Sequence, residues 1–242
     1  MIVGKKKCLA IIGLRSGSKG IKNKNIRLFR GKPLVFWIIE AAKNSKLINR
    51  IIISTDSSDY ARICRSYGAE VPFLRPEELS HDKSIESEYL VHALNWLKIN
   101  EGYEPDFVSR LQATSPLQLP KDIDDTIEAL INDPKANSSM AAFKSSLLPH
   151  KALAMDSNCN YIESYYSGTS SLEIQNRQEF KDAYYRGNII TSRYIDFIKT
   201  KKQVGKCSKL IEIPEERGVD INSELDLLVA ETIAKKLGIC KI

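Results

Sequence analysis

Almost continuously apolar stretches alternate along the chain with amphipathic ones, which predicts alternating strands and helices. Cys8–Leu14 and Arg50–Thr55 are nearly unbroken apolar runs, as is typical of strands covered on both faces of a sheet. Between them, the apolar residues of Leu34–Lys43 recur at helical spacing. The same criteria predict further strands at Val71–Leu74, Phe107–Leu111, Ser139–Phe143, Asn188–Thr191 and Lys209–Ile213, and further helices at Ser58–Tyr67, Glu86–Lys98, Ile123–Ile131 and Glu224–Leu237. This alternation favours an α/β fold with a mostly parallel sheet and crossover helices.

Residues 144–184 interrupt the alternation. They are polar, rich in Ser and Asn, and without a clear period, and five of the ten tyrosines lie between Tyr161 and Tyr185. We therefore expect one α/β domain made of residues 1–143 and 185–242, with residues 144–184 as an inserted lobe. Tyrosine is enriched at interfaces because it buries area while keeping a polar tip, so the lobe is a candidate dimerisation element. A flexible surface excursion is the alternative.

Composition narrows the class of protein. The chain has 242 residues, of which 43% are hydrophobic and 27% charged, which excludes collagen-like and intrinsically disordered classes. No apolar run approaches the ~18 residues that a membrane span needs. The five cysteines and three histidines are scattered, with no C-x-x-C pair, so neither a zinc site nor a disulfide framework is expected. These features predict a reduced, cytoplasmic protein.

Positive charge is concentrated at one end of the chain. Residues 1–39 hold ten Lys or Arg and no Asp or Glu, whereas the remainder carries 26 basic against 30 acidic residues. A segment so one-sided indicates a polyanionic ligand, either a nucleic acid backbone or the phosphates of a nucleotide.

A glycine-rich basic loop follows the first predicted strand, where ligands of open parallel sheets bind. It runs over residues 13–25 and contains three glycines, with Arg15, Lys19 and Lys24 among them. Glycines let backbone N–H groups approach phosphate oxygens, and the cations can neutralise them. The spacing fits neither a Walker A loop nor a dinucleotide-binding fingerprint. A merely solvated basic loop is the plainer alternative.

At this loop the sequence resembles a known family. R-S-G-S-K-G-I-K-N-K-N, from Arg15 to Asn25, resembles the R-x-G-S-K-G-x-x-x-K-N signature of the acylneuraminate cytidylyltransferases, the CMP-sialic acid synthetases. Further similar segments follow in order: Arg75–Leu79 with Asp82, Leu111–Leu117, Asn176–Gln178 leading to Tyr185–Asn188, and Val219–Asp226. The resemblance spans essentially the whole chain.

The resemblance implies a Rossmann-like nucleotidyltransferase fold and an activity. Such enzymes use CTP and Mg²⁺ to place CMP on the anomeric hydroxyl of a nonulosonic acid, releasing pyrophosphate. It also implies roles for individual residues, with Arg15, Lys19 and Asp220 as catalytic. The expected nucleotide-binding residues are Leu14, Arg15, Gly17, Ser18, Lys19, Lys24, Asn25 and Arg75. Gln112 and Arg186 would face the acidic sugar, and Lys151 would reach the site of a neighbouring subunit in a homodimer.

One carboxylate of the family's metal-binding pair is replaced. Asp220 precedes the last predicted helix, and the second Asp of the family pattern is here Asn222. Asn can coordinate Mg²⁺ through its carbonyl oxygen but contributes no charge and cannot act as a base. We therefore expect Asp220 and Asn222 to be the metal ligands. Ser223 and Asp226 are expected to form a capping box for the helix instead.

Other departures from the family pattern lie in its sugar-facing parts. Gln118 stands where the family often has Arg, Asn188 is followed by Ile-Ile-Thr-Ser, and Lys83–Glu86 lacks the usual paired serines. The particular acid, whether sialic, legionaminic or pseudaminic, therefore stays open.

Three alternative functions remain. One is another sugar nucleotidyltransferase, for example one acting on ketodeoxyoctonic acid, and another is a metal-dependent glycosyltransferase with a D-x-N motif. The third is a nucleic acid-binding protein, but the basic residues converge on one loop rather than on a continuous face. No nucleic acid or membrane partner is expected.

Overall fold

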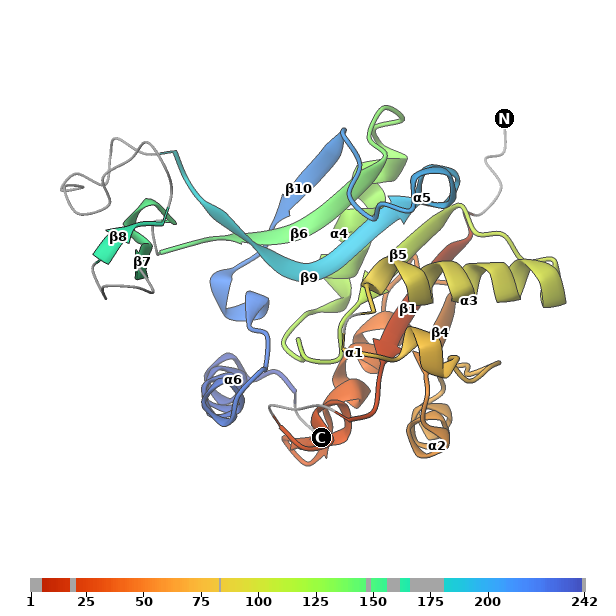
Figure 1. The fold of residues 1–242 in the computed structure, drawn as a ribbon, viewed down its shortest axis with the longest axis horizontal. Helices are drawn as coiled ribbons and strands as arrows, with labels where there is room; N and C mark the ends of the chain where they lie inside the picture. The colour runs from red at the N-terminus through yellow and green to blue at the C-terminus, as the bar shows by residue number, and fades with distance from the viewer. Residues whose placement is uncertain are drawn as a thin grey trace.

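A six-stranded sheet with the strand order β10-β6-β9-β5-β1-β4 forms the centre of the protein (Figure 1). The computed structural model describes residues 6–17, 21–82, 84–146, 149–155, 162–165 and 181–240. The strands are β1 (Cys8–Leu14), β4 (Arg50–Thr55), β5 (Phe107–Leu111), β6 (Ser138–Lys144), β9 (Tyr184–Arg193) and β10 (Ser208–Glu212). β9 runs antiparallel to β5 and β6, and the other pairings are parallel. The predicted α/β class with a mostly parallel sheet is thus confirmed.

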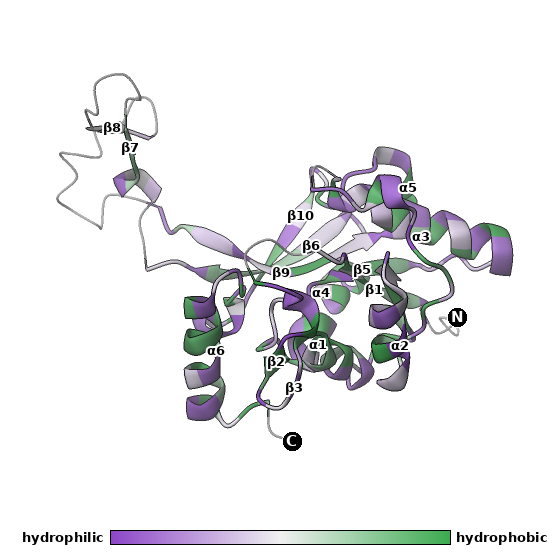
Figure 2. Cartoon of the chain, turned by 60° about the horizontal axis from the view of Figure 1, so that its bottom comes forward, coloured by the Kyte–Doolittle hydropathy of each residue, from purple (hydrophilic) through white to green (hydrophobic). Residues whose placement is uncertain are grey.

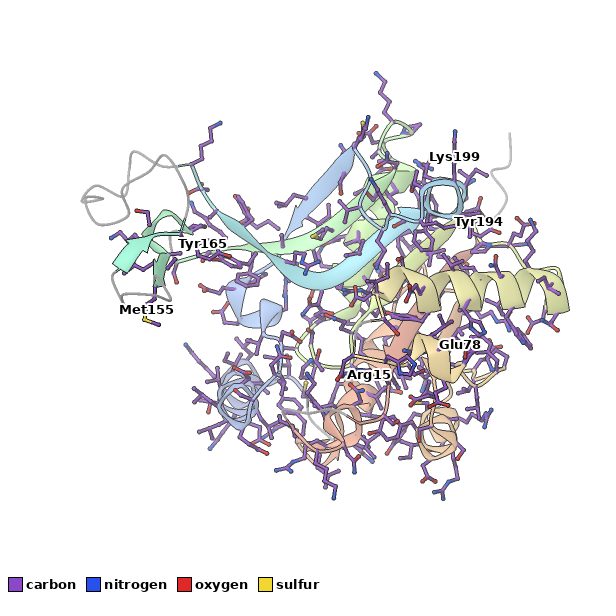
Figure 3. The ribbon with its side chains drawn as sticks, viewed as in Figure 1. Arg15, Glu78, Met155, Tyr165, Tyr194 and Lys199 are labelled. Atoms are coloured by element: carbon purple, nitrogen blue, oxygen red, sulfur yellow. The ribbon has the colours of Figure 1, made fainter. Side chains whose placement is uncertain are left out.

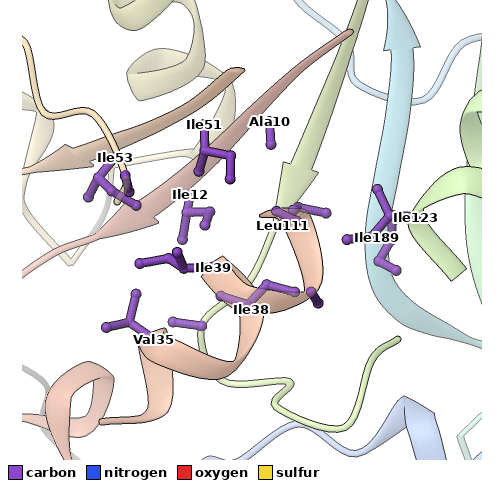
Figure 4. Packing of buried hydrophobic residues seen from close by; sticks show 14 of the residues in the cluster. Ala10, Ile12, Val35, Ile38, Ile39, Ile51, Ile53, Leu111, Ile123 and Ile189 are labelled. Carbon is purple, nitrogen blue, oxygen red and sulfur yellow. The ribbon is translucent and has the colours of Figure 1, made fainter. Parts of the chain in front are cut away.

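Helices cover both faces of the sheet. They are α1 (Leu34–Lys43), α2 (Ser58–Ser66), α3 (Glu86–Glu101), α4 (Pro120–Ile131), α5 (Tyr194–Thr200) and α6 (Glu224–Leu237). Successive residues of β1 pack on opposite faces, as the two-residue period of a strand requires. Ile12 joins a core cluster with α1, α2 and α4 (Figure 4), whereas Ile11 joins a cluster with α3 and α5. β1 is therefore buried on both sides, which explains its unbroken apolar sequence.

The periodicity predicted some elements to the residue and failed for others. Val71–Leu74 is not a strand: only Glu70 bridges to Ile52, and Pro72 lacks the N–H that a ladder needs. α5 was not predicted, and β9 is longer than the predicted Asn188–Thr191. None of the helices in the described ranges is long and apolar enough to cross a membrane.

The segment between β6 and β9 leaves the sheet at the paired ends Lys144 and Tyr184. Within it, β7 (Leu153–Met155) and β8 (Ile162–Ser164) form a separate antiparallel pair. This pair stands away from the sheet in both views (Figures 1 and 2). Most of the predicted lobe, Tyr161 and Tyr166 included, lies outside the described residues. Its role as a dimerisation element stays a prediction.

Candidate active site

A pocket of about 190 Å³ opens at the carboxyl ends of β1 and β5, where ligands of open α/β sheets bind. It is lined by residues from the end of β1 and the loop after it, from α3 and the stretch that leads into it, and from the loop after β5: Gly13, Arg15, Arg75, Leu79, His81, Asp82, Ser84, Glu86, Tyr89 and Gln112. The structure thus brings together three of the predicted site residues, Arg15, Arg75 and Gln112. Figure 3 shows Arg15 at this end of the sheet, in the half of the molecule that also holds Glu78.

The loop after β1 is anchored by hydrogen bonds before its glycines. The backbone N–H and the hydroxyl of Ser16 donate to the carboxylate of Asp56 at 2.8 and 2.5 Å. Buried Asn25 donates from Nδ2 to the carbonyl oxygen of Arg15 at 3.1 Å. The Arg15 guanidinium pairs with Asp82 at 2.5 Å, and both side chains are partly exposed. The backbone around Arg15 is therefore held in place, and the Arg15 side chain lines the pocket.

The other five predicted nucleotide-binding residues of this segment are not among the described residues that line the pocket. Ser18 and Lys19 lie outside the described residues. Gly17 has φ +73°, the left-handed conformation that glycine adopts without strain. The side chain of Leu14 is fully buried in the core, so only its backbone can face a ligand. Lys24 lies in a short 3₁₀ turn, Lys24–Ile26, beside the C-terminal segment.

Arg75 is a buried cation. It is 6% exposed, donates from Nε to Ser54 Oγ at 3.1 Å and from Nη2 to the Ser54 carbonyl oxygen, and lies 4.6 Å above the ring of Tyr89. Burial lowers its pKa. No ion pair within the described ranges includes it. Because a buried charge is costly unless it is paired, an anion bound in this pocket would stabilise Arg75.

Tyr89, below Arg75, also explains a glycine. A Cβ atom on Gly13 would lie 2.5 Å from Cζ of Tyr89, so any larger residue would push the ring aside. Gly13 thus allows the helix α3 to bring Tyr89 against the end of β1. Burial raises the pKa of Tyr89 to about 12, so its hydroxyl stays neutral.

One acidic residue that lines the pocket, Glu86, forms an ion pair that was not predicted from the sequence. Arg110 on β5 donates from Nη2 and Nε to Glu86 Oε2 at 2.5 and 3.1 Å. Gln112 donates from Nε2 to Glu86 Oε1 at 3.2 Å. Val108, Arg110 and Gln112 are alternate residues of the chain, so their side chains lie on the same face of the sheet, the one that α3 covers. Two features of the sequence indicated these residues: the charged Arg110 inside the otherwise uncharged run Phe107–Leu111, and the loss of the family's paired serines at Lys83–Glu86.

Asp220 and Asn222 lie together next to Lys24. Lys24 Nζ donates to Asn222 Oδ1 at 2.8 Å, and Asn222 Nδ2 donates to Asp220 Oδ2 at 2.9 Å. The backbone N–H of Ile221 donates to the carbonyl oxygen of Thr114, which holds this segment against the loop after β5. Burial lowers the pKa of Lys24. The negative charge of Asp220 raises this pKa in part, and the positive charge of Arg15 lowers it further.

The donor set of this segment suits Mg²⁺ only in part. Asp220 Oδ1 is buried and has no hydrogen-bond partner among the residues that the structure describes, so one carboxylate oxygen is available for a cation. The described part of the chain contains no group of three or more His, Cys, Asp or Glu side chains that could hold a metal. Mg²⁺ often binds through one or two carboxylates, waters and substrate phosphates, and Asp220 fits that pattern. Ser223 and Asp226 form the predicted capping box of α6.

Two predicted sugar-binding residues are not among those that line the pocket. Arg186 is exposed on β9, in register with Ala142 of β6. Lys151 is exposed in the 3₁₀ turn Pro149–Lys151, just before β7. Figure 3 shows Met155 and Tyr165, on and beside the β7–β8 pair, far from Arg15. Neither Arg186 nor Lys151 lines the pocket of its own chain.

Sequence comparisons cover almost the entire chain. The family model described as cytidylyltransferase matches residues 9–232. An N-acylneuraminate cytidylyltransferase of Escherichia coli is 32% identical over 98% of this chain and 54% of its own length. The post-translational flagellin modification protein B of Campylobacter coli is 31% identical, over 94% of this chain and 95% of its own. A CMP-N,N'-diacetyllegionaminic acid synthase of Legionella pneumophila is 29% identical, over 93% and 95%. The chain thus spans about half the length of the Escherichia coli relative.

Solved structures share the fold. A CMP:2-keto-3-deoxy-manno-octonic acid synthetase complexed with CTP superposes with a TM-score of 0.70 over 96% of this chain and 99% of that one, at 15% identity. A 4-diphosphocytidyl-2C-methyl-D-erythritol synthase of Anaerococcus prevotii superposes with a TM-score of 0.66 at 14% identity. At these identities the likeness concerns the fold alone.

Proposed function

This chain belongs to the cytidylyltransferase family, and from that membership we propose that it transfers CMP from CTP to the anomeric hydroxyl of a nonulosonic acid, releasing pyrophosphate. The observation that carries the proposal is the buried Arg75, which forms no ion pair with any described residue and lies in a pocket beside the glycine loop and Arg15. Relatives that match over most of the chain and are named for N-acylneuraminic and diacetyllegionaminic acids support the acceptor class.

The cations around the pocket would hold the triphosphate. Nucleotidyl transfer needs charge neutralisation at phosphorus and an oriented nucleophile more than covalent help from the protein. Arg15, Lys24 and Arg75 supply three cations, and the predicted Ser18 and Lys19 would extend the cradle. The anchoring of Ser16 on Asp56 and of Asn25 on the Arg15 carbonyl fixes the loop before the substrate binds. Such preorganised groups stabilise developing charge without reorganising during the reaction.

Mg²⁺ would be held by Asp220 and Asn222 together with phosphate oxygens of CTP. When bound, the ion would neutralise phosphate charge and help to align the reacting groups. Asp220 Oδ1 is available for it, whereas Asn222 Oδ1 already accepts a hydrogen bond from Lys24. Asp220 is therefore the main proposed ligand, and Asn222 has to share its oxygen with Lys24.

The acceptor side of the site is proposed to span two subunits. Gln112 lies in the pocket next to Glu86. Lys151 of a second copy, in a homodimer formed by the 144–184 lobe, would bring a cation to the carboxylate of the acid. Arg186 is proposed to contribute at the entrance to the same site.

Pyrophosphate release from CTP and Mg²⁺ tests the proposal directly. The panel should contain sialic, legionaminic, pseudaminic and eight-carbon ketodeoxyoctonic acids, each also assayed with ATP, GTP and UTP. We expect release that depends on the acid and is largest with CTP, and none when Arg75 is replaced by Met. Equal turnover with all four nucleotides would exclude a cytidylyltransferase. RNA binding that rivals CTP binding and falls steeply with salt would favour the nucleic acid-binding alternative.

A further inference from the structure

The proposed triphosphate cradle does not include the Glu86–Arg110 pair, although Glu86 lines the pocket. Glu86 is the first residue of α3, and Arg110 is the fourth residue of β5. The Arg110 side chain is 4% exposed, whereas the Glu86 side chain is 39% exposed and lines the pocket. The buried partner is the cation, and the partner that a ligand can reach is the carboxylate.

A carboxylate is an unexpected group in a pocket proposed for two anionic substrates. Beside Arg15 and Arg75 it would weaken the attraction for phosphates and for a sugar acid unless its own charge is balanced. Arg110 supplies this balance through two hydrogen bonds to Glu86 Oε2, and its Nη1 also donates to the Asn188 carbonyl oxygen at 3.2 Å. The pair as a whole is close to neutral, so it can present hydrogen-bond acceptors without repelling an anion.

The lone pairs of Glu86 are unequally used. Oε2 accepts both bonds from Arg110 and a long one from Gln203 at 3.4 Å, whereas Oε1 accepts one bond, from Gln112 at 3.2 Å. An ionised carboxylate offers about four acceptor positions and no donor. Glu86 Oε1, beside Gln112, therefore keeps acceptor capacity on the side of the pocket.

We propose that Glu86 is a specificity-determining residue for the acceptor: its carboxylate accepts a hydrogen bond from an N–H or O–H substituent of the sugar acid. Arg110 is the positioning residue, because it orients the carboxylate and balances its charge. This inference rests on the proposed cytidylyl transfer and deepens it. It selects acids that carry a donor at one ring or side-chain position over acids with a methyl or hydrogen there.

Replacing Glu86 by Gln tests this. In E86Q, Arg110 would hold the amide oxygen, and the NH₂ group would face Gln112 and the pocket, so a donor would replace an acceptor. The matched control is E101Q, the same change at the other end of α3, where Glu101 Oε2 pairs with Arg50 at 2.6 Å. A double variant, E86Q/R110Q, guards against unfolding caused by leaving Arg110 buried and unpaired.

The assay compares, for each variant, KM for CTP, KM for the acid and kcat. The acids are those turned over by the wild type, together with analogues deoxygenated or N-methylated at single positions. We expect E86Q and E86Q/R110Q to raise KM for the acid roughly tenfold, while KM for CTP changes less than about twofold. We also expect one analogue, poor for the wild type, to be used by both variants about as well as its parent acid. E101Q should behave as the wild type.

The outcomes separate the two proposals. If the wild type uses an acid but E86Q matches E101Q in every parameter, or changes the KM of CTP and acid equally, the specificity role is wrong and cytidylyl transfer stands. If the wild type releases no pyrophosphate with any acid, the proposed function fails and the specificity role fails with it.

Discussion

Lys24 Nζ donates a hydrogen bond to Asn222 Oδ1 across 2.8 Å, although the two residues are 198 positions apart in the chain. Asn222 in turn donates to Asp220 Oδ2 at 2.9 Å. A cation from the proposed triphosphate cradle is thus linked through one amide to the proposed metal ligand. Because Asn222 Oδ1 both accepts from Lys24 and is the atom that would bind a metal, the two proposed sites would be coupled through Asn222.

The first prediction concerns this amide. Asn222→Asp would place a second carboxylate 2.9 Å from Asp220, where two like charges repel unless a cation lies between them. Lys24 would offset part of that repulsion. We expect the Mg²⁺ concentration for half-maximal activity to fall roughly tenfold, since added ligand charge tightens cation binding. A calorimetric titration with Mn²⁺ in the absence of CTP should likewise show tighter metal binding. Unchanged or weaker binding would contradict a metal role for position 222.

Asp220→Asn completes that test by removing only charge. With Asn at both positions, Mg²⁺-supported activity should fall by at least about a hundredfold, because no carboxylate of the pair is left. Asp59→Asn is the control, since Asp59 is an exposed carboxylate paired with Arg62 at 2.9 Å. Normal activity of the Asp220 variant at ordinary Mg²⁺ concentrations would exclude Asp220 as the ligand.

A second prediction concerns Arg15. Replacing it by Ala should raise the barrier of the transfer step by roughly 3–5 kcal/mol, the scale of losing one transition-state donor. Stability should change by less than about 1 kcal/mol, because the Arg15–Asp82 pair is partly exposed. The measurements are kcat/KM with CTP and Tm, with Arg62→Ala as an exposed ion-pair control. We expect Lys19→Ala to behave similarly, and near-normal kcat in both variants would show that the loop is not the site.

A third prediction is an alkaline limit on activity set by Lys24. Burial lowers the pKa of Lys24 from 10.5, so the free protein loses this cation at a lower pH than an exposed lysine would. We expect kcat/KM for CTP to fall as pH rises through the lowered pKa, because that ratio reports the free enzyme. In Lys24→Arg the fall of kcat/KM should occur at a higher pH, since the guanidinium stays charged. If the fall of kcat/KM at high pH occurs at the same pH in the variant, a group other than Lys24 causes it.

The lowered pKa of Lys24 affects stability in the opposite direction to activity: as pH rises, it increases the free energy of unfolding. The folded state holds the proton of Lys24 less tightly than the unfolded state, in which the pKa is near the ordinary 10.5. The unfolded state therefore binds more protons between the lowered pKa and 10.5, and this group's contribution to the free energy of unfolding rises with pH in that window. Activity and this part of the stability should thus diverge there.

Hydrophobic periodicity predicted the exact bounds of well-buried elements such as Cys8–Leu14 and Leu34–Lys43. The burial of these elements is set by neighbours on both sides. Periodicity could not predict that β9 runs antiparallel, because direction depends on the path of the connection rather than on the strand's own pattern. The loop cations were accessible from sequence because they crowd one short segment. The contact between Glu86 and Arg110 was not, since the two residues lie 24 positions apart and only the packing of α3 on β5 joins them.

The last prediction is a shared site in a homodimer. Lys151 is exposed, and the β7–β8 pair that follows it stands away from the sheet (Figure 2). If Lys151 serves the acceptor's carboxylate, it must therefore reach the pocket of a second copy. A Lys151→Ala subunit mixed with an Arg15→Ala subunit would then form heterodimers with one intact site each, because each supplies what the other lacks. With equal amounts and free exchange, about a quarter of the wild-type activity should return in a twofold-symmetric dimer. Mixing Arg15→Ala with Arg75→Ala should restore nothing, because both arginines line the pocket of their own chain. A fully active monomer by light scattering at assay concentration would refute both the dimer and the shared site.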